Sequence, residues 1–297
     1  MNISITSSNA SAMDECPDHL IDTDQHYNSK AKQPNEMPGL EMIDKLRNEP
    51  FNLSVEEKLQ SHPYVKAAED GTLTIAQQHA FVREQYSILL SMSISLSSLA
   101  GHKDFTPSSL KGITVPKLPR HHYCYCCNRL IPSDEGEEEE TDLFQFLLDG
   151  VEHIAKLLDA HAKSLGVDEE TLKAWYPVLL PKCETYHTYW SFLALSNKRA
   201  AAAAACAVNF PTWGQVCGRL LEAFGKEDKY DSVDDDGLAF LKFHSTPIEG
   251  LDLDEMAASI IEKEGTSYED LVEHVRLLQE FEVLFWDGIY EGQGQSK

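Results

Sequence analysis

Glu282 is the carboxylate in this sequence best placed for proton transfer, because it occurs within a row of apolar residues. The row has a 4-3-4-3-4 spacing and consists of Leu271, Val275, Leu278, Glu282, Phe285 and Ile289. This spacing places all of these side chains on one face of an α-helix. A carboxylate on such a face is costly to bury unless it is paired, protonated or hydrogen-bonded. Glu282 is therefore either tuned for proton transfer or for holding a ligand's amine, or it is the structural partner of a buried Arg, Tyr or Asn.

Gln85 interrupts a second apolar row, within a helix predicted over residues 74–100. A side-chain amide in a core row must be hydrogen-bonded. Gln85 therefore either contacts a ligand or ties two helices together, and Glu84 is the carboxylate beside it.

Asn209 and Trp213 flank Pro211 in the segment VNFPTWG. A proline within a helix removes the hydrogen-bond partner of the carbonyl four residues earlier, here that of Ala207. We expect Asn209 to be a hydrogen-bonding group near this opening and Trp213 to offer an aromatic wall, which suits a planar ligand. Plain packing is the alternative for both residues.

One cluster resembles a metal site. It comprises His121, His122, Cys124, Cys126 and Cys127. A structural zinc site usually has two cysteine pairs of C-x2–4-C spacing, and this chain has no second pair. The helix expected around Pro211 contributes no His or carboxylate between Arg199 and Leu221, as a di-iron bundle would require. We therefore predict no metal. The absence of Walker, G-x-G-x-x-G, G-x-S-x-G and H-E-x-x-H motifs excludes most nucleotide-binding, lipase and metalloprotease functions.

Net charge and composition limit the classes of molecule that this chain can bind. The 297 residues carry a formal net charge of -24, which makes nucleic acid an unsuitable partner because phosphate is repelled. No apolar run approaches the roughly 20 residues of a membrane span. The N-terminus has no signal pattern, and the seven cysteines are expected to be reduced thiols of a cytoplasmic protein.

The periodicity predicts an all-α chain. Residues 1–48 lack a sustained period and are typical of a disordered arm, residues 49–292 form a helical domain with a loop insertion over 103–140, and 293–297 form a tail. After the helix over 74–100, further helices are expected over 141–165, 168–177, 183–197, 198–225 (kinked near Pro211), 238–245, 252–264 and 267–290. No segment has the alternation typical of a strand.

Four segments in this order resemble the thiaminase-II (TenA-type) family and its relative, the pyrroloquinoline-quinone synthase type. They are HPYVKAAEDGTLT with FVREQY, LGVDEETLKAWYP through ETYHTY, NFPTWGQVCGRLLEAF, and FEVLFWDGIYE. The resemblance covers about residues 55–291 without the insertion. It implies a heme-oxygenase-like multi-helical bundle with a pocket for an aminopyrimidine, no cofactor, and a homo-oligomeric assembly.

Carried over by position, the resemblance makes Glu282 the family's catalytic glutamate. The family's aspartate falls on Gln85, with Glu84 as the nearest carboxylate. Its nucleophilic cysteine falls on Asn209, and Cys206, three residues earlier, is the substitute nucleophile.

Two further pocket positions follow in the same way. A tyrosine falls on Trp213, and a second tyrosine falls on Glu184, with Tyr186 close by. The implied function is aminopyrimidine hydrolysis in thiamine degradation or salvage, with an altered catalytic set. The alternatives are a binding protein or enzyme for another small polar aromatic molecule, and a heme-oxygenase-like oxidase.

Overall fold

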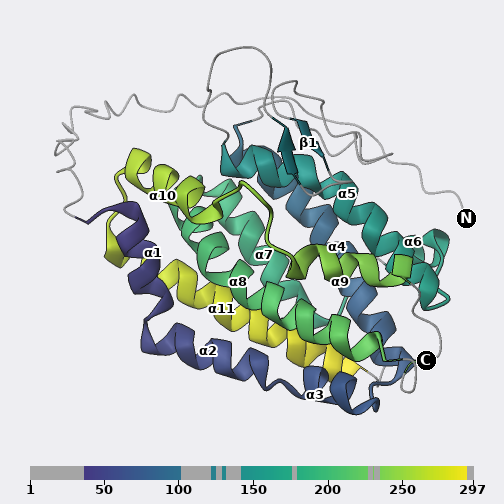
Figure 1. The fold of residues 1–297 in the computed structure, drawn as a ribbon. Helices are drawn as coiled ribbons and strands as arrows, with labels where there is room; N and C mark the ends of the chain where they lie inside the picture. The colour runs from purple at the N-terminus through teal and green to yellow at the C-terminus, as the bar shows by residue number, and fades with distance from the viewer. Residues whose placement is uncertain are drawn as a thin grey trace, which may run out of the picture. The chain divides into compact units, whose positions relative to one another are not determined.

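Among the described residues, the regular secondary structure is helical apart from one short hairpin. The computed structural model describes residues 37–101, 122–124, 129–131, 142–175, 179–226, 230 and 235–292. Its helices are α1 (Gly39–Arg47), α2 (Pro50–Gln60), α3 (Pro63–Asp70), α4 (Ile75–Leu99), α5 (Leu143–Ser164), α6 (Glu169–Trp175), α7 (Pro181–Leu195), α8 (Arg199–Phe224), α9 (Asp235–Ser245), α10 (Leu253–Glu264) and α11 (Tyr268–Glu291) (Figure 1). The predicted all-α fold is confirmed. None of these helices is long and apolar enough to cross a membrane.

The hairpin lies within the predicted insertion and corrects the expectation of no strand. Strands β1 (His122–Cys124) and β2 (Arg129–Ile131) pair antiparallel, with Tyr123 opposite Leu130. Three residues are too short a run for a period of two to stand out. The rest of the predicted insertion, the first 36 residues of the predicted arm and the predicted tail lie outside the described residues.

Helix α1 corrects the boundary between arm and domain, because it lies inside the segment expected to be disordered. Its side chains of Met42, Ile43 and Leu46 are buried. At its start, the backbone N–H of Gly39 donates to Glu262 on α10 at 2.7 Å, and a Cβ at Gly39 would lie 2.6 Å from the carbonyl oxygen of Ala258. Within the described residues, the helical domain therefore includes α1 from Gly39, ten residues before the predicted start at 49.

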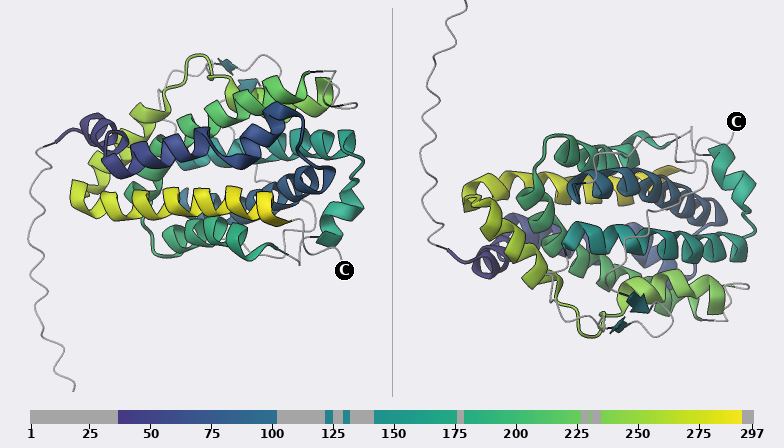
Figure 2. Two further views of the ribbon diagram at one scale, coloured as in Figure 1. Left: turned by 90° about the horizontal axis from the view of Figure 1, so that it is seen from below. Right: turned by 90° about the horizontal axis from the view of Figure 1, so that it is seen from above.

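Helices α4, α7, α8 and α11, which carry the predicted site residues, pack against one another. Helix α11 packs against α7, α8 and α2, and α4 packs against α5 and α7. Figure 2 shows α11 (yellow) running beside α2 and α3 on one side and α7 on the other. The predicted face of α11 is confirmed, since Leu271, Val275, Leu278, Phe285 and Ile289 are all buried around Glu282.

Helix α8 continues unbroken across Pro211. Its first two turns contain Ala200–Ala205, none of them more than 3% exposed, so neighbouring helices approach its backbone closely. The carbonyl of Ala207, which Pro211 leaves without a helical partner, accepts hydrogen bonds from Arg47 of α1 at 2.6 and 3.2 Å.

Candidate functional site

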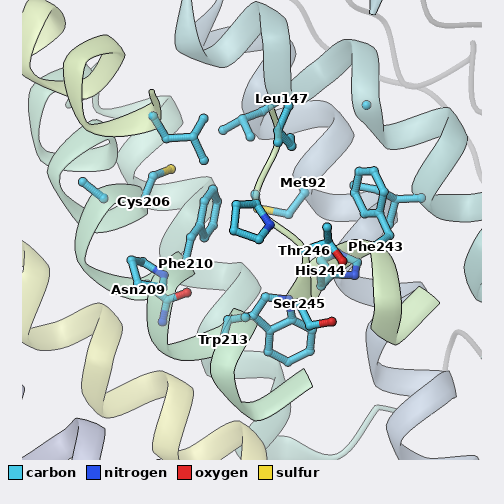
Figure 3. A pocket seen from close by; sticks show the side chains of 18 of the residues that line it. Met92, Leu147, Cys206, Asn209, Phe210, Trp213, Phe243, His244, Ser245 and Thr246 are labelled. Atoms are coloured by element: carbon cyan, nitrogen blue, oxygen red, sulfur yellow. The ribbon is translucent and has the colours of Figure 1, made fainter. Parts of the chain in front are cut away.

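A cavity of about 840 Å³ lies among α4, α5, α7, α8, α9 and α11 (Figure 3). Six of the eight predicted site residues line it, namely Gln85, Tyr186, Cys206, Asn209, Trp213 and Glu282. A volume of this size is in the range of small-molecule sites, which run from roughly 300 to 1,000 Å³.

Glu282 is the buried acid of this cavity, only 4% exposed. The indole N–H of Trp286 donates to its Oε1 at 2.8 Å, and Nδ2 of Asn209 lies 3.4 Å from its Oε2. Burial raises the pKa of the Glu282 carboxyl to about 7, although both hydrogen bonds act in the opposite direction. At neutral pH this group can therefore both give up and take up a proton.

Asn209 is fixed by its neighbours. Its Nδ2 donates to Oε1 of Gln279 at 3.0 Å, and its Oδ1 accepts from the hydroxyl of Tyr186 at 3.1 Å. Burial raises the pKa of Tyr186 well above its ordinary value, with the nearby Glu282 adding to the effect, so the phenol keeps the proton that it donates. Asn209 is thus held with its amide nitrogen toward Glu282.

Gln85 is buried, at 6% exposure, and lines the cavity from α4. Within the described part of the chain, no hydrogen-bond partner lies within reach of its side-chain amide. A buried amide needs a partner. Gln85 is therefore placed to hydrogen-bond to a molecule that enters the cavity.

Cys206 lies almost one helical turn before Asn209 and lines the same cavity. Burial raises the pKa of its thiol above the ordinary range. Since the thiolate is the nucleophilic form, the thiol as it stands is poorly activated.

Trp213 lines the cavity from α8 and presents an aromatic ring. Its ring is stacked with that of Phe81, with 6.3 Å between the ring centroids. It meets the ring of His244 edge to face, with 5.7 Å between the centroids. These contacts fix the plane of the indole, and a flat ligand group could stack against it.

Two of the predicted site residues do not line the cavity. Glu84 is buried, but its Oε1 accepts from Arg83 at 2.8 Å and from the backbone N–H of Leu180 at 3.2 Å. Glu184 is exposed on α7. Successive helical residues point about 100° apart, so a residue next to Gln85, or two before Tyr186, faces elsewhere.

His244 is a cavity residue that the sequence did not reveal. Its Nδ1 lies 2.8 Å from the carbonyl oxygen of Phe240, which can only accept, so Nδ1 carries the ring proton and Nε2 has a free lone pair. Burial lowers the pKa of His244 to about 4, which keeps the ring neutral. Figure 3 shows it near Phe243 and Trp213. Its position at the end of a short helix with little periodicity gave no signal.

Among the described residues, no three or more His, Cys, Asp or Glu side chains gather in a way that could hold a metal ion. Most of the predicted metal-like cluster lies outside the described residues. His121, Cys126 and Cys127 are not described, and for His122 and Cys124 only the backbone of β1 is.

No profile of a known protein family matches the sequence, and no curated protein matches it. Several solved structures share the fold, and two of them are TenA homologues. One is a TenA homologue from P. horikoshii OT3, with a TM-score of 0.57 and 16% identity, over 84% of this chain and 99% of that protein. The other is a TenA homologue from Pseudomonas syringae pv. tomato str. DC3000, with a TM-score of 0.56 and 13% identity, over 86% and 93%. The fold is therefore the all-α, heme-oxygenase-like bundle of TenA homologues, as predicted.

Proposed function

We propose that the cavity binds a nitrogen-containing small molecule and that Glu282 exchanges a proton with it. The observation that carries this proposal is the Glu282 carboxyl itself, buried against the cavity with a pKa of about 7. A group with a pKa near the working pH is the most effective acid–base catalyst. The amide of Gln85 supplies a second polar contact for the ligand, and Trp213 supplies a flat wall.

The enzymatic form of this proposal is hydrolysis of an amino group from an aminopyrimidine. Water would add to the ring carbon that bears the amine, with its proton passing to the Glu282 carboxylate, and that proton would then leave with ammonia. The ring gains an oxygen and loses a nitrogen, so no oxidant is needed. Burial disfavours the thiolate of Cys206, so we assign the attack to water rather than to this thiol.

The test is release of ammonia, together with the corresponding hydroxypyrimidine, from a pyrimidine that carries an amine on its ring, by the full-length protein. Glu282→Gln should lower the turnover by about a hundredfold or more, the usual contribution of a positioned acid–base group. Glu280→Gln is the matched control on the same helix, because this side chain is 42% exposed and pairs with Arg276. It should keep full activity. Turnover that is unchanged in Glu282→Gln would contradict the assignment.

A second candidate is a binding protein without turnover. It is favoured by Asn209, which occupies the position of the family's nucleophile but carries an amide that cannot act as a thiolate does. In this case an aminopyrimidine, or another polar aromatic molecule, should raise the melting temperature of wild type with no product formed. The same ligand should stabilise Gln85→Leu less.

A further inference from the structure

The cavity continues far beyond the polar groups around Glu282. Along α4, the residues that line it begin at Gln85 and end at Leu96, with Ile88, Leu89 and Met92 between them. At about 1.5 Å per residue, these eleven steps extend roughly 16 Å along the helix. Only the first of these residues, Gln85, is polar.

The wall facing α4 is also apolar. Leu147, Val151 and Ile154 of α5 are spaced by four and three residues, which places them on one helical face, and Phe210 of α8 adds a ring. Figure 3 shows Leu147 across the cavity from Asn209. Met92, Leu147 and Ile154 are only half-buried, so apolar surface faces the space between the helices. This apolar arm of the cavity, lined from Ile88 to Leu96 and by α5, would bury hydrocarbon favourably.

The polar groups around Glu282 mainly offer hydrogen-bond acceptors. The Arg47 guanidinium also lines the cavity, but it is already paired with Asp254 and with the carbonyl of Ala207. The carboxyl of Glu282 and Nε2 of His244 accept, and the amide of Gln85 can accept or donate. Asn209 and Tyr186 are already bonded to each other. A ligand head that matches the polar groups around Glu282 is therefore a donor, such as an amine or ammonium group.

The volume argues for a ligand larger than an aminopyrimidine. A water molecule takes about 30 Å³ of liquid, so a ring compound with about ten heavy atoms would occupy at most roughly 300 Å³. The cavity measures about 840 Å³. More than half of it, including the apolar arm, would stay unfilled.

We infer that the ligand of this cavity is an amphipathic amine, with its amine head at Glu282 and Gln85 and an extended hydrocarbon tail in the apolar arm. This inference rests on the proposed function, since it uses the same site and the same acid, and it narrows the ligand to one chemical class. Along α4 the lining ends at Leu96, so we expect an upper limit on the length of the tail.

The experiment is titration calorimetry of the full-length protein with hexylamine, octylamine, decylamine and dodecylamine, each below its micelle concentration. Burying each added pair of methylenes should tighten the Kd by about tenfold until the tail reaches roughly 16 Å. Decanoate, with the same number of carbon atoms and an acidic head, should bind more weakly than decylamine. Equal affinity along the amine series, or equal affinity for decanoate, would overturn the inference.

Met92→Gln and Ile94→Gln form a matched pair on α4. Met92 lines the cavity, whereas Ile94 is 37% exposed and is not part of its lining. Met92→Gln should remove most of the increase in affinity with tail length. Ile94→Gln should leave this increase unchanged. Leu147→Gln tests the facing wall independently if Met92→Gln does not fold. If the affinity still increases with tail length in both Met92→Gln and Leu147→Gln, the tail binds elsewhere and the inference is overturned.

The two proposals fail in different ways. An aminopyrimidine that is hydrolysed with dependence on Glu282, while the amines bind without any gain from tail length, would overturn the inference and leave the proposed function standing. Amines that bind equally to wild type and Glu282→Gln would overturn the inference, because the head would not be at this acid. The proposed function is overturned separately, by unchanged turnover in Glu282→Gln.

Discussion

The guanidinium group of Arg47 donates hydrogen bonds to the carbonyl oxygen of Ala207, the group that Pro211 leaves without a helical partner. The same guanidinium forms a two-pronged ion pair with Asp254 of α10, both contacts at 2.6 Å. Arg47 thereby joins α1, α8 and α10 at the wall of the cavity. The segment of α8 that presents Cys206 and Asn209 is supported by this contact.

Replacing Arg47 with Met should lower the free energy of unfolding by about 2 to 3 kcal/mol, because the Ala207 carbonyl loses a charged donor and Asp254 loses its partner. Arg47→Lys should lower the free energy of unfolding by less, since its ammonium group can still make some of the hydrogen bonds that the guanidinium makes. Urea denaturation measures both changes. Arg276→Met is the control, because its ion pairs with Glu273 and Glu280 lie on the surface of one helix and should contribute below about 1 kcal/mol.

Glu282 should make the stability of the fold depend on pH. Its folded pKa, about 7, lies above its ordinary value of 4.5, so between these values the folded chain holds a proton that the unfolded chain releases. The free energy of unfolding should therefore fall as pH rises through this window, by on the order of 3 kcal/mol from this group. Glu282→Gln should remove that fall, and urea denaturation of both proteins from about pH 5 to about pH 8 measures it. Parallel curves for the two proteins would contradict a raised pKa.

Replacement of Gln85 and of Gln279 by leucine should change the stability of the fold in opposite directions. Gln85→Leu removes a buried amide that has no partner within the described chain, and should stabilise the fold by about 1 kcal/mol while weakening ligand binding. Gln279→Leu removes the acceptor of Asn209 Nδ2 and should destabilise it by about 1 to 2 kcal/mol. Thermal denaturation with and without ligand separates the two. A loss of stability in Gln85→Leu would mean that its amide is satisfied by the protein.

The Cys206 thiol should be slow to react with iodoacetamide at neutral pH. Burial raises its pKa, so little thiolate forms in the folded protein. Peptide mass spectrometry should find its alkylation at least about tenfold slower in the folded than in the urea-unfolded chain. Cys217, also buried and also with a raised pKa, is an internal reference that does not line the cavity. Rapid and selective labelling of Cys206 would instead support it as a nucleophile.

Periodicity predicted the helices well where an apolar face is long. The row around Glu282 covers the whole of α11, and its burial follows directly from the spacing. Helix α1 is short and has only Met42, Ile43 and Leu46 to bury, so it did not stand out from the polar residues before it. As a result Arg47, whose role depends on contacts with α8 and α10, could not be found from the sequence.

The site was predicted less completely than the fold for a related reason. Pattern and resemblance place Gln85 and Tyr186 near a pocket, but they also admit Glu84 and Glu184, which point away from it. Only the rotation of each helix in the folded chain decides between neighbouring positions. His244 depends on a tertiary arrangement in which α9 closes one side of the cavity.

The alanines at the start of α8 limit how the cavity can change. Residues Ala200–Ala205 are tightly covered by neighbouring helices, so a larger side chain there would force the bundle apart rather than reshape the binding space. By contrast, α4 and α5 line the cavity with half-buried side chains that differ in size. A mutant library intended to change ligand preference should therefore vary Ile88, Met92, Leu147 and Ile154. It should leave Ala200–Ala205 of α8 unchanged.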